Sequence, residues 1–406
     1  MIKLSPVNKK RWQRFKENRR GYWCFAIFIF ITFIAMASEL FFNSKALMVS
    51  YKGEWSFPFI QKQFANKDFG GDGKAEPDYV QLQKRFEKEN KGNWVLMPFV
   101  PYDAAYISRI DKAPLDKKID QIQSEYNPKF ASIMADSSLS DGSKTRKKHD
   151  LNLELNIKKG EVEKLKYHPL PPDSSKSHYM GTDTSGRDIF ARLMYGYRYA
   201  IGFAIILLLI NYSIGVSIGC LMGYMGGIFD LVVQRIIEII SNVPFLYVIM
   251  IIGAIMREKG MEMGFWTLIG VYAIFGWMGM TWYMRTTTFK EKAREYILAA
   301  KANGSSNTRI IFSHILPNVV SLLVTFIPFS ISGSIVGLTS LDYLGYGLPK
   351  GTPSWGELIK MGTEDMNSPW IVLSVVSAMV LVLFLINSVG EAVREAFDPK
   401  KISTYE

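Results

Sequence analysis

The stretch from residue 199 to residue 229, YAIGFAIILLLINYSIGVSIGCLMGYMGGIF, contains no charged side chain. A helix rises ~1.5 Å per residue, so about 20 such residues cross the ~30 Å hydrocarbon core of a bilayer. Backbone polar groups cannot stay unpaired in lipid, and a helix pairs all of them within one segment. Because Gly223, Gly226 and Gly227 interrupt the pattern, we expect the bilayer part to stop near Met222.

Five further apolar runs are long enough to cross a bilayer as helices. They cover residues 22–42, 236–256, 264–284, 318–341 and 371–389. Tryptophan side chains, typical of membrane interfaces, lie at or near the ends of these runs; they are Trp23, Trp266, Trp277 and Trp370. The pattern predicts an all-α polytopic membrane protein with six transmembrane helices. We expect Pro244 and Pro328 to kink the third and fifth helices.

The basic residues predict the orientation. The net charge of +11 is concentrated beside apolar runs, which argues against nucleic-acid binding. Residues 1–21, the segment 286–317 between the fourth and fifth runs, and the tail 390–406 are rich in Lys and Arg. With six spans these three segments lie on one side, so both termini are expected in the cytoplasm. The alternative, a signal peptide cleaved after Ala35-Met36-Ala37, is weakened by the length of the first run.

A large polar segment, residues 43–198, separates the first two runs and is predicted to be extracytoplasmic. Its strand-like stretches, Tyr51–Phe59 and Trp94–Tyr102, predict a small sheet, so we expect a mixed domain with a small α+β element. The charged stretch 115–166 is expected to be helical or partly disordered. Charge runs are mostly solvated surfaces, and the alternative here is a docking surface for an external partner.

The sequence contains no pattern that is typical of an enzyme active site or of a metal site. Cys24 and Cys220 both fall in apolar runs and have no metal-ligand or disulfide spacing. The Gly-rich stretches lack the Gly-x-x-x-x-Gly-Lys-Ser/Thr pattern that cradles phosphate, and no catalytic set appears in the spans. We therefore predict no catalytic residue and no cofactor bound by this chain.

The segment 286–317, which we call the coupling loop, is the most informative part of the sequence. A short helix over 294–303 should end at Gly304, since glycine suits a left-handed helix cap. Ser305 or Ser306 can cap a second short helix, and Pro317 can start the fifth span, where its missing N–H costs little. Such helices at right angles would form a rigid knob, and its small residues would allow close approach by another protein.

The coupling loop resembles the EAA loop of bacterial ABC importer permeases. The family pattern is Glu-Ala-Ala, three residues, Gly, nine residues and Ile-x-Leu-Pro. Leu298 stands in place of the glutamate and His314 in place of the isoleucine. The resemblance implies an ATPase-coupling site, which comprises Glu295, Ala299, Ala300, Gly304, His314, Leu316 and Pro317.

A second motif precedes the second run, where GTDTSGRD begins at Gly181. It is similar to a motif of one subunit class of dipeptide and oligopeptide permeases. The positions that match are Gly181, Thr182, Asp183, Gly186, Arg187, Asp188, Arg192, Gly196 and Arg198. The two leading glycines suit tight turns, and the charges Asp183, Arg187 and Asp188 can form a charge-assisted network at the outer surface. A structural brace is favoured over direct substrate contact.

The other stretches that resemble a known family also resemble these permeases. Residues 4–12, together with residues 51–58, are most similar to microcin C and oligopeptide permeases. The resemblance implies an importer of peptides or peptide-like compounds in the bacterial inner membrane. Its implied partners are a second homologous permease, two ABC ATPase subunits that bind ATP and Mg, a periplasmic solute-binding protein and membrane lipid. The resemblance does not extend to residues 110–165, which look like an insertion that makes this chain longer than is usual in the family.

Arg235 and Glu238 stand one helical turn apart near the start of the third run. An ion pair between them is favoured over a role in the transport pathway. The rival functions are a secondary transporter or channel, for which mid-bilayer charges are too few, and an external domain that acts alone. The substrate, the residues that contact it, the role of 110–165 and whether the ATPases are two copies or one fused chain stay open.

Overall fold

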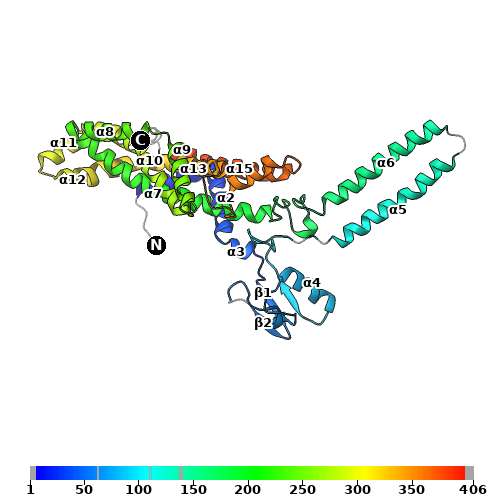
Figure 1. Ribbon diagram of the computed structural model, residues 1–406. Helices are drawn as coiled ribbons and strands as arrows, with labels where there is room; N and C mark the ends of the chain where they lie inside the picture. Colours follow the sequence, from blue (N-terminus) through cyan, green and yellow to red (C-terminus); the bar gives the residue numbers. More distant parts are fainter. Residues whose placement is uncertain (1–5, 62–63, 109, 111, 137–139, 398–406) are drawn as a thin grey trace. The chain divides into compact units, whose positions relative to one another are not determined.

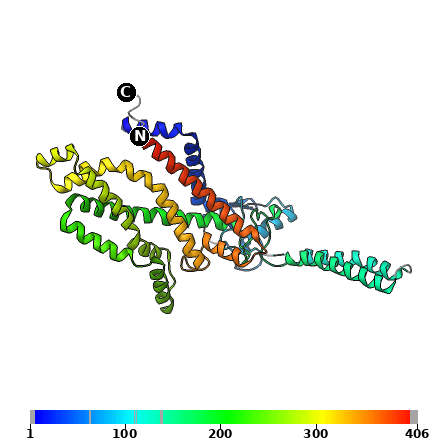
Figure 2. The ribbon, with the colours of Figure 1, turned by 90° about the horizontal axis from the view of Figure 1, so that it is seen from above.

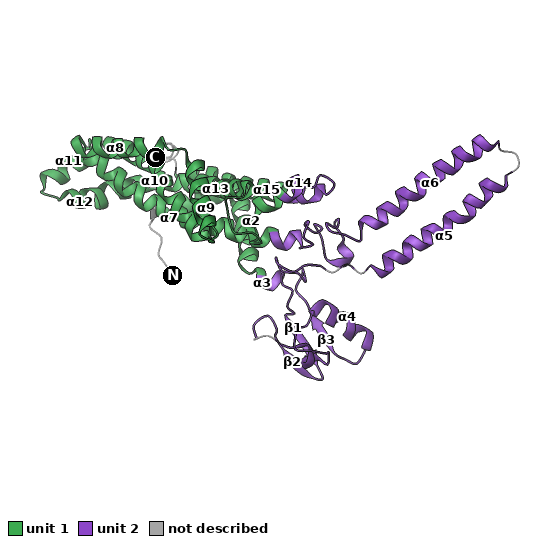
Figure 3. Cartoon of the chain, viewed as in Figure 1, with its two compact units in different colours: residues 1–38, 193–360, 375–406 green, residues 39–192, 361–374 purple. Residues whose placement is uncertain are grey.

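The computed structural model describes residues 6–61, 64–108, 110, 112–136 and 140–397. The chain forms two compact units (Figure 3). Unit 1 contains residues 1–38, 193–360 and 375–406, and unit 2 contains residues 39–192 and 361–374. The boundary that we predicted at residue 198 falls within a continuous helix.

Unit 1 is helical where it is described (Figure 1). Its helices, three of which extend into unit 2, are α1 Pro6–Glu17, α2 Arg19–Met36, α7 Ile189–Met225, α8 Gly227–Ser241, α9 Phe245–Glu258, α10 Phe265–Glu291, α11 Glu295–Ala302, α12 Asn307–Arg309, the π-helix η3 Ile310–Ile315, α13 Leu316–Leu344, α14 Trp355–Glu364 and α15 Pro369–Phe397.

Five helices of the described chain are long and apolar enough to cross a bilayer. They are α2, α7, α10, α13 from Leu322 onward, and α15. A sixth span exists only if α8 and α9, which are bent by 66° at the break between them, count as one. The run 236–256 is therefore two helices and not one, and the chain bends at Pro244, where we expected a kink. Pro244 stands at the N-cap of α9 and has no N–H with which to continue α8, whereas α13 runs through Pro328 without a break.

The first run is also interrupted. Helix α2 ends at Met36, and a short helix α3, Ser38–Phe41, follows a turn at Ala37.

Three glycines on one face of α7 allow close packing against α10. A Cβ at Gly215, Gly219 or Gly223 would lie only 2.7, 2.6 and 2.5 Å from carbonyl oxygens of Trp277, Thr281 and Arg285, respectively. The four-residue spacing of the glycines brings them to the same face. Gly223 thus belongs to a helix contact, and α7 continues through it to Met225.

Unit 2 contains the small sheet that we predicted, with strands β1 Met48–Tyr51, β2 Glu54–Ser56 and β3 Trp94–Leu96. The strand order is β2-β1-β3, and both pairs are antiparallel. Helix α4, Tyr79–Glu89, packs on the sheet through Tyr79, Leu82 and Phe86, which are buried with Val49 and Val95. Short 3-10 helices occur at Asn66–Phe69 (η1) and Ser174–Lys176 (η2).

The charged stretch 115–166 is mainly helical. Helices α5, Ala113–Ala135, and α6, Asp141–Lys164, pair as a hairpin. The buried Tyr126 donates from its hydroxyl to Glu154 at 2.6 Å, and Lys166 pairs with Asp116 at 2.7 Å.

We predict that Gly219→Ala destabilises the chain by about 1–3 kcal/mol, because the new methyl group would lie 2.6 Å from the backbone carbonyl oxygen of Thr281 and force the two helices apart. The control is Gly202→Ala on the same helix, where the new methyl group would have no described atom within 4 Å. The thermal unfolding midpoint in mild detergent measures the difference. Equal midpoints for the two variants would contradict the close α7–α10 contact.

Candidate functional site

The turn of the coupling loop is held by backbone hydrogen bonds. Gly304 has a φ of +76°, in the left-handed region, as the sequence predicted. The N–H of Ser305 donates to the carbonyl of Ala300 at 3.1 Å, and that of Gly304 donates to Lys301 at 3.0 Å. These two bonds define a Schellman motif, which closes α11 and turns the chain sharply. Ser306 caps α12 by accepting from the N–H of Arg309 at 3.4 Å.

The second short helix of the loop is not separate, which corrects our expectation. Helix α12 leads through the π-helix η3 into α13 without a break. Pro317 is consequently the second residue of a continuing helix. It has no N–H to donate, and the wide turn before it, in which the N–H of Leu316 donates to Ile311, accommodates the missing bond.

The inner side of the loop is packed into an apolar cluster. Ile297 of α11 and the residues Ile310, Ile311 and Ile315 of η3 are buried. They share this cluster with Cys220 and Tyr224 of α7 and Met284 of α10. Burial of each isoleucine contributes about 1.5–3 kcal/mol. The loop is therefore anchored to the helices α7, α10 and α13, and the hydroxyl of Tyr224 also bonds Asn307 at 3.2 Å.

The outer side of the loop is exposed. Of the residues that we predicted there, Glu295, Ala299, Gly304 and Pro317 are exposed, and Ala300, His314 and Leu316 are half-buried. Leu298, at the position of the family's glutamate, is 56% exposed. A Cβ added at Gly304 would have no described atom within 4 Å. The exposed side of the loop thus carries Leu298, Ala299 and Gly304 together with the polar Lys301 and Asn303.

A buried ion pair near this loop escaped the sequence analysis. Asp230 of α8 accepts two hydrogen bonds from Arg285 of α10, from Nε at 2.5 Å and from Nη2 at 2.6 Å. Asp230 is buried, so the bidentate pair fixes α8 to α10. The two residues lie 55 positions apart in the sequence. The only sequence feature that pointed to the pair was the acidic residue Asp230 itself, which follows Gly226 and Gly227.

The ion pair between Arg235 and Glu238 is present, with 2.5 Å between Nη1 and Oε2. Both side chains are exposed, at 75% for Arg235 and 43% for Glu238. Exposed pairs of this kind contribute little to stability.

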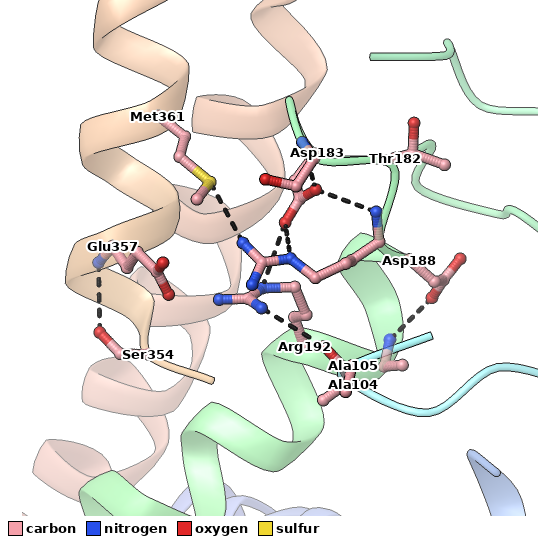
Figure 4. A network of polar contacts seen from close by, with 12 residues as sticks. Ala104, Ala105, Thr182, Asp183, Asp188, Arg192, Ser354, Glu357 and Met361 are labelled. Carbon is pink, nitrogen blue, oxygen red and sulfur yellow. Dashed lines mark hydrogen bonds and ion pairs between the residues drawn. The ribbon is translucent and has the colours of Figure 1, made fainter. Parts of the chain in front are cut away.

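The second motif, residues 181–198, is built around Asp183, which is fully buried (Figure 4). Its Oδ2 accepts from Nε of Arg187 at 2.8 Å and lies 3.4 Å from Nε of Arg192. Its Oδ1 accepts from the backbone N–H groups of Ser185 and Arg187, both at 2.9 Å. Arg192 also donates to the carbonyl of Ala104 at 3.3 Å. One carboxylate therefore holds the turn and the first turn of α7 together.

Asp188 lies outside this network, contrary to our expectation. It caps α7 by accepting from the N–H of Ala191 at 2.8 Å, and its other oxygen pairs with Nδ1 of His178 at 2.8 Å. Nε2 of His178 lies 2.8 Å from the hydroxyl of Ser108, and Tyr102 stacks on the imidazole with ring centroids 4.2 Å apart. A carboxylate at a helix N-terminus accepts a hydrogen bond from a backbone N–H that has no partner within the helix. This explains why Asp188 caps α7 instead of joining the network around Asp183. Sequence reasoning missed His178.

The two glycines of the motif are at tight turns, as predicted. Gly181 and Gly186 have φ values of +79° and +83°. A Cβ at Gly186 would lie 2.6 Å from the ring of His168. Thr182, between them in sequence, accepts from the N–H of Leu170 at 2.7 Å.

The last two positions of the motif lie on α7 within unit 1. A Cβ at Gly196 would approach the indole of Trp355 to 3.0 Å, so this glycine serves helix packing. Arg198 lies over the ring of Tyr195, 4.9 Å from its centroid. The structure thus brings Asp183, Arg187 and Arg192 together and leaves Gly196 and Arg198 further along the helix.

Comparisons with known proteins identify relatives of this chain. Residues 215–403 match the family described as the binding-protein-dependent transport system inner membrane component. The inner membrane ABC transporter permease protein YejE of Escherichia coli is 35% identical over 401 residues, which cover 99% of both chains.

Two further relatives differ in how much of the chain they match. The peptidoglycan transport system permease protein YejE of Agrobacterium fabrum is 35% identical over 98% of this chain and 94% of its own length. The oligopeptide transport system permease protein OppC of Lactococcus lactis (strain IL1403) is 34% identical over 56% of this chain and 77% of its own length. The match to the oligopeptide permease thus leaves almost half of this chain uncovered.

We predict that Asp230→Ala destabilises the chain by about 3 kcal/mol, because it leaves the guanidinium of Arg285 partly buried without its carboxylate. The matched control is Glu238→Ala, which breaks an exposed ion pair in the same helix and should cost less than about 1 kcal/mol. Unfolding midpoints in detergent compare the two. A larger loss for Glu238→Ala would show that the buried pair does not hold α8.

Proposed function

Because the chain belongs to the family of binding-protein-dependent transport system inner membrane components, as the permease subunit of an ABC importer, we propose that its coupling loop transmits the work of partner ATPase subunits. The observation that carries this proposal is the exposed turn at Gly304, set on a packed base. A cleft in an ATPase would receive Leu298, Ala299 and Gly304, and the small size of Ala299 and Gly304 would leave room for close contact.

The packing of the loop supports this role. Ile297 and Ile311 are buried against residues of α7 and α10, and η3 continues directly into α13. A force on the exposed turn therefore acts on three spanning helices together, since packed apolar interiors transmit displacement with little compression. Movement of these helices would open the pathway alternately to the two sides of the membrane.

We propose peptides or peptide-containing compounds as the cargo. The relatives are named for oligopeptide and peptidoglycan transport. A periplasmic solute-binding protein would deliver the cargo, and a second homologous permease subunit would complete the pathway. ATP and Mg would bind to the two ATPase domains, on separate chains or one fused chain, while this chain would bind no cofactor and catalyse no reaction.

We further propose that the chain lies in the bacterial inner membrane with both termini in the cytoplasm. The basic segments support this orientation, because Lys and Arg in short flanking segments stay on the cytoplasmic side. The coupling loop then faces the ATPases, and residues 43–198 lie outside. The buried charges at Asp183 would brace the outer end of α7 without contacting cargo.

We predict that Gly304→Arg abolishes co-purification of the ATPase and cargo-stimulated ATP hydrolysis. The charged side chain would project into the proposed cleft, and arginine disfavours the left-handed conformation by about 1–2 kcal/mol. The measurement is co-purification in mild detergent followed by an ATPase assay of the assembled importer.

Gly304→Asn serves as the matched control, because asparagine tolerates the left-handed conformation and has a short neutral side chain. The asparagine variant should co-purify with most of the ATPase that the wild type retains. Full coupling in the arginine variant would refute the proposed role of this turn.

The orientation predicts which cysteines a membrane-impermeant maleimide labels in cells whose outer membrane has been permeabilised. Leu153→Cys on α6 should react in these cells, and Leu298→Cys in the coupling loop only after the inner membrane is lysed and the peripheral ATPase is stripped from it. Both leucines are more than half exposed, whereas the native Cys24 and Cys220 are buried. The reverse order of labelling would invert the proposed topology.

A further inference from the structure

An apolar cavity of about 220 Å³ lies between the spanning helices α2, α13 and α15 of unit 1. Phe25 and Phe28 of α2 line it, with Ile327 and Ile331 of α13. Residues Ile386 and Val389 of α15 complete this part of the wall, and every lining residue is apolar. A cavity of this composition in a spanning region suits hydrocarbon rather than a polar cargo.

Strong positive charge precedes the cavity along the chain. Residues 8–20 contain seven Lys or Arg side chains and one acid, Glu17. Five of the basic residues are exposed, namely Lys9, Lys10, Lys16, Arg19 and Arg20. The exposed indole of Trp12 lies among them on α1. Basic residues around an exposed tryptophan are typical of a helix at a membrane interface.

Helix α1 is packed onto the end of α15 (Figure 2). Phe15 is buried with Ala392 and Ala396. The amide of Asn18 donates to the carboxylate of Glu395 at 3.0 Å. The basic residues therefore have a fixed place beside the helices that form the cavity.

The charged cluster and the cavity are continuous. The ring of Phe15 meets that of Phe25, a cavity residue, edge to face with centroids 5.7 Å apart. Arg20 donates to the hydroxyl of Ser388 on α15 at 3.4 Å. On α2, Arg20 precedes Phe25 and Phe28 by five and eight residues, which is about 8–12 Å along a helix. The guanidinium of Arg20 reaches Ser388 and the ring of Phe384 on α15, which lie within two residues of the cavity-lining Ile386, so its charge lies beside the cavity lining.

We propose that this site binds a phospholipid with an anionic headgroup. One acyl chain fills the cavity between α2, α13 and α15, and the phosphate lies against Arg19, Arg20 and Lys16. The excess of positive charge selects an anionic headgroup over a zwitterionic one. A helix of a second permease subunit would match the apolar cavity but not the basic cluster. The site depends on α2 spanning the membrane and is independent of the coupling loop.

The test uses the assembled importer in nanodiscs of phosphatidylcholine, with and without palmitoyl-oleoyl-phosphatidylglycerol. Native mass spectrometry counts the lipids retained after release. The wild type should retain phosphatidylglycerol in preference to phosphatidylcholine. The double variant Arg19→Gln with Arg20→Gln should retain phosphatidylglycerol more weakly, by about fivefold for each charge removed.

Two further variants separate the parts of the site. Ile331→Trp, which fills the cavity, should reduce retention of both lipids. The control, Arg146→Gln with Lys147→Gln, removes two exposed charges from α6 in unit 2 and should change nothing. Unchanged ATPase co-purification in all variants would show that the assembly is intact.

Retention of phosphatidylglycerol by the double glutamine variant at the wild-type level would overturn the proposal, as would equal retention of the two lipids by the wild type. A cysteine at Ile331 that cross-links to the second permease subunit would also overturn it, because protein would then occupy the cavity.

Discussion

Backbone hydrogen bonds cannot be exchanged for water inside a bilayer, and this constraint governs the rest of the molecule. It requires the apolar runs to be helical, and the helices must then pack without a strong hydrophobic force between them. The α7–α10 contact meets this demand with Gly215, Gly219 and Gly223, whose missing side chains let the two backbones approach. Irregular backbone, such as the turn at Gly304, lies largely in the polar segments of the described chain, although a turn at Ala37 and the break between α8 and α9 interrupt two of the apolar runs.

Helix α7 links the two motifs that resemble those of peptide permeases. Asp188 caps its beginning, directly after the turn that Asp183 holds. Near its other end, Cys220 and Tyr224 pack under the coupling loop. The charges at both ends are paired, Asp183 with Arg187 and Asp230 of α8 with Arg285 of α10. Paired charges of this kind fix helix ends, and the proposed lipid site would add a third anchor beside α2.

The sequence predicted much of this arrangement, because helix length, glycine turns and strand patterning are local properties. The left-handed cap at Gly304 and the pairing of Arg235 with Glu238 follow from residues a few positions apart. The missed features depend on residues distant in sequence. The pair of Asp230 with Arg285 joins residues 55 positions apart, and His178 is covered by Tyr102 and bonded to Ser108, which lies 70 positions away. Gly223 suggested a helix end because a glycine at a helix contact and a glycine at a break are alike in sequence.

The most direct test of the account is a photocross-link from the coupling loop. A benzoylphenylalanine at Ala299, which is exposed beside the turn at Gly304, is introduced into the assembled importer and irradiated in native membranes. The account predicts an adduct with an ATPase subunit, whereas the same probe at the exposed Leu153 of α6 gives none. Adducts with lipid alone at Ala299, or with the ATPase from Leu153, would contradict the assignment of the coupling loop.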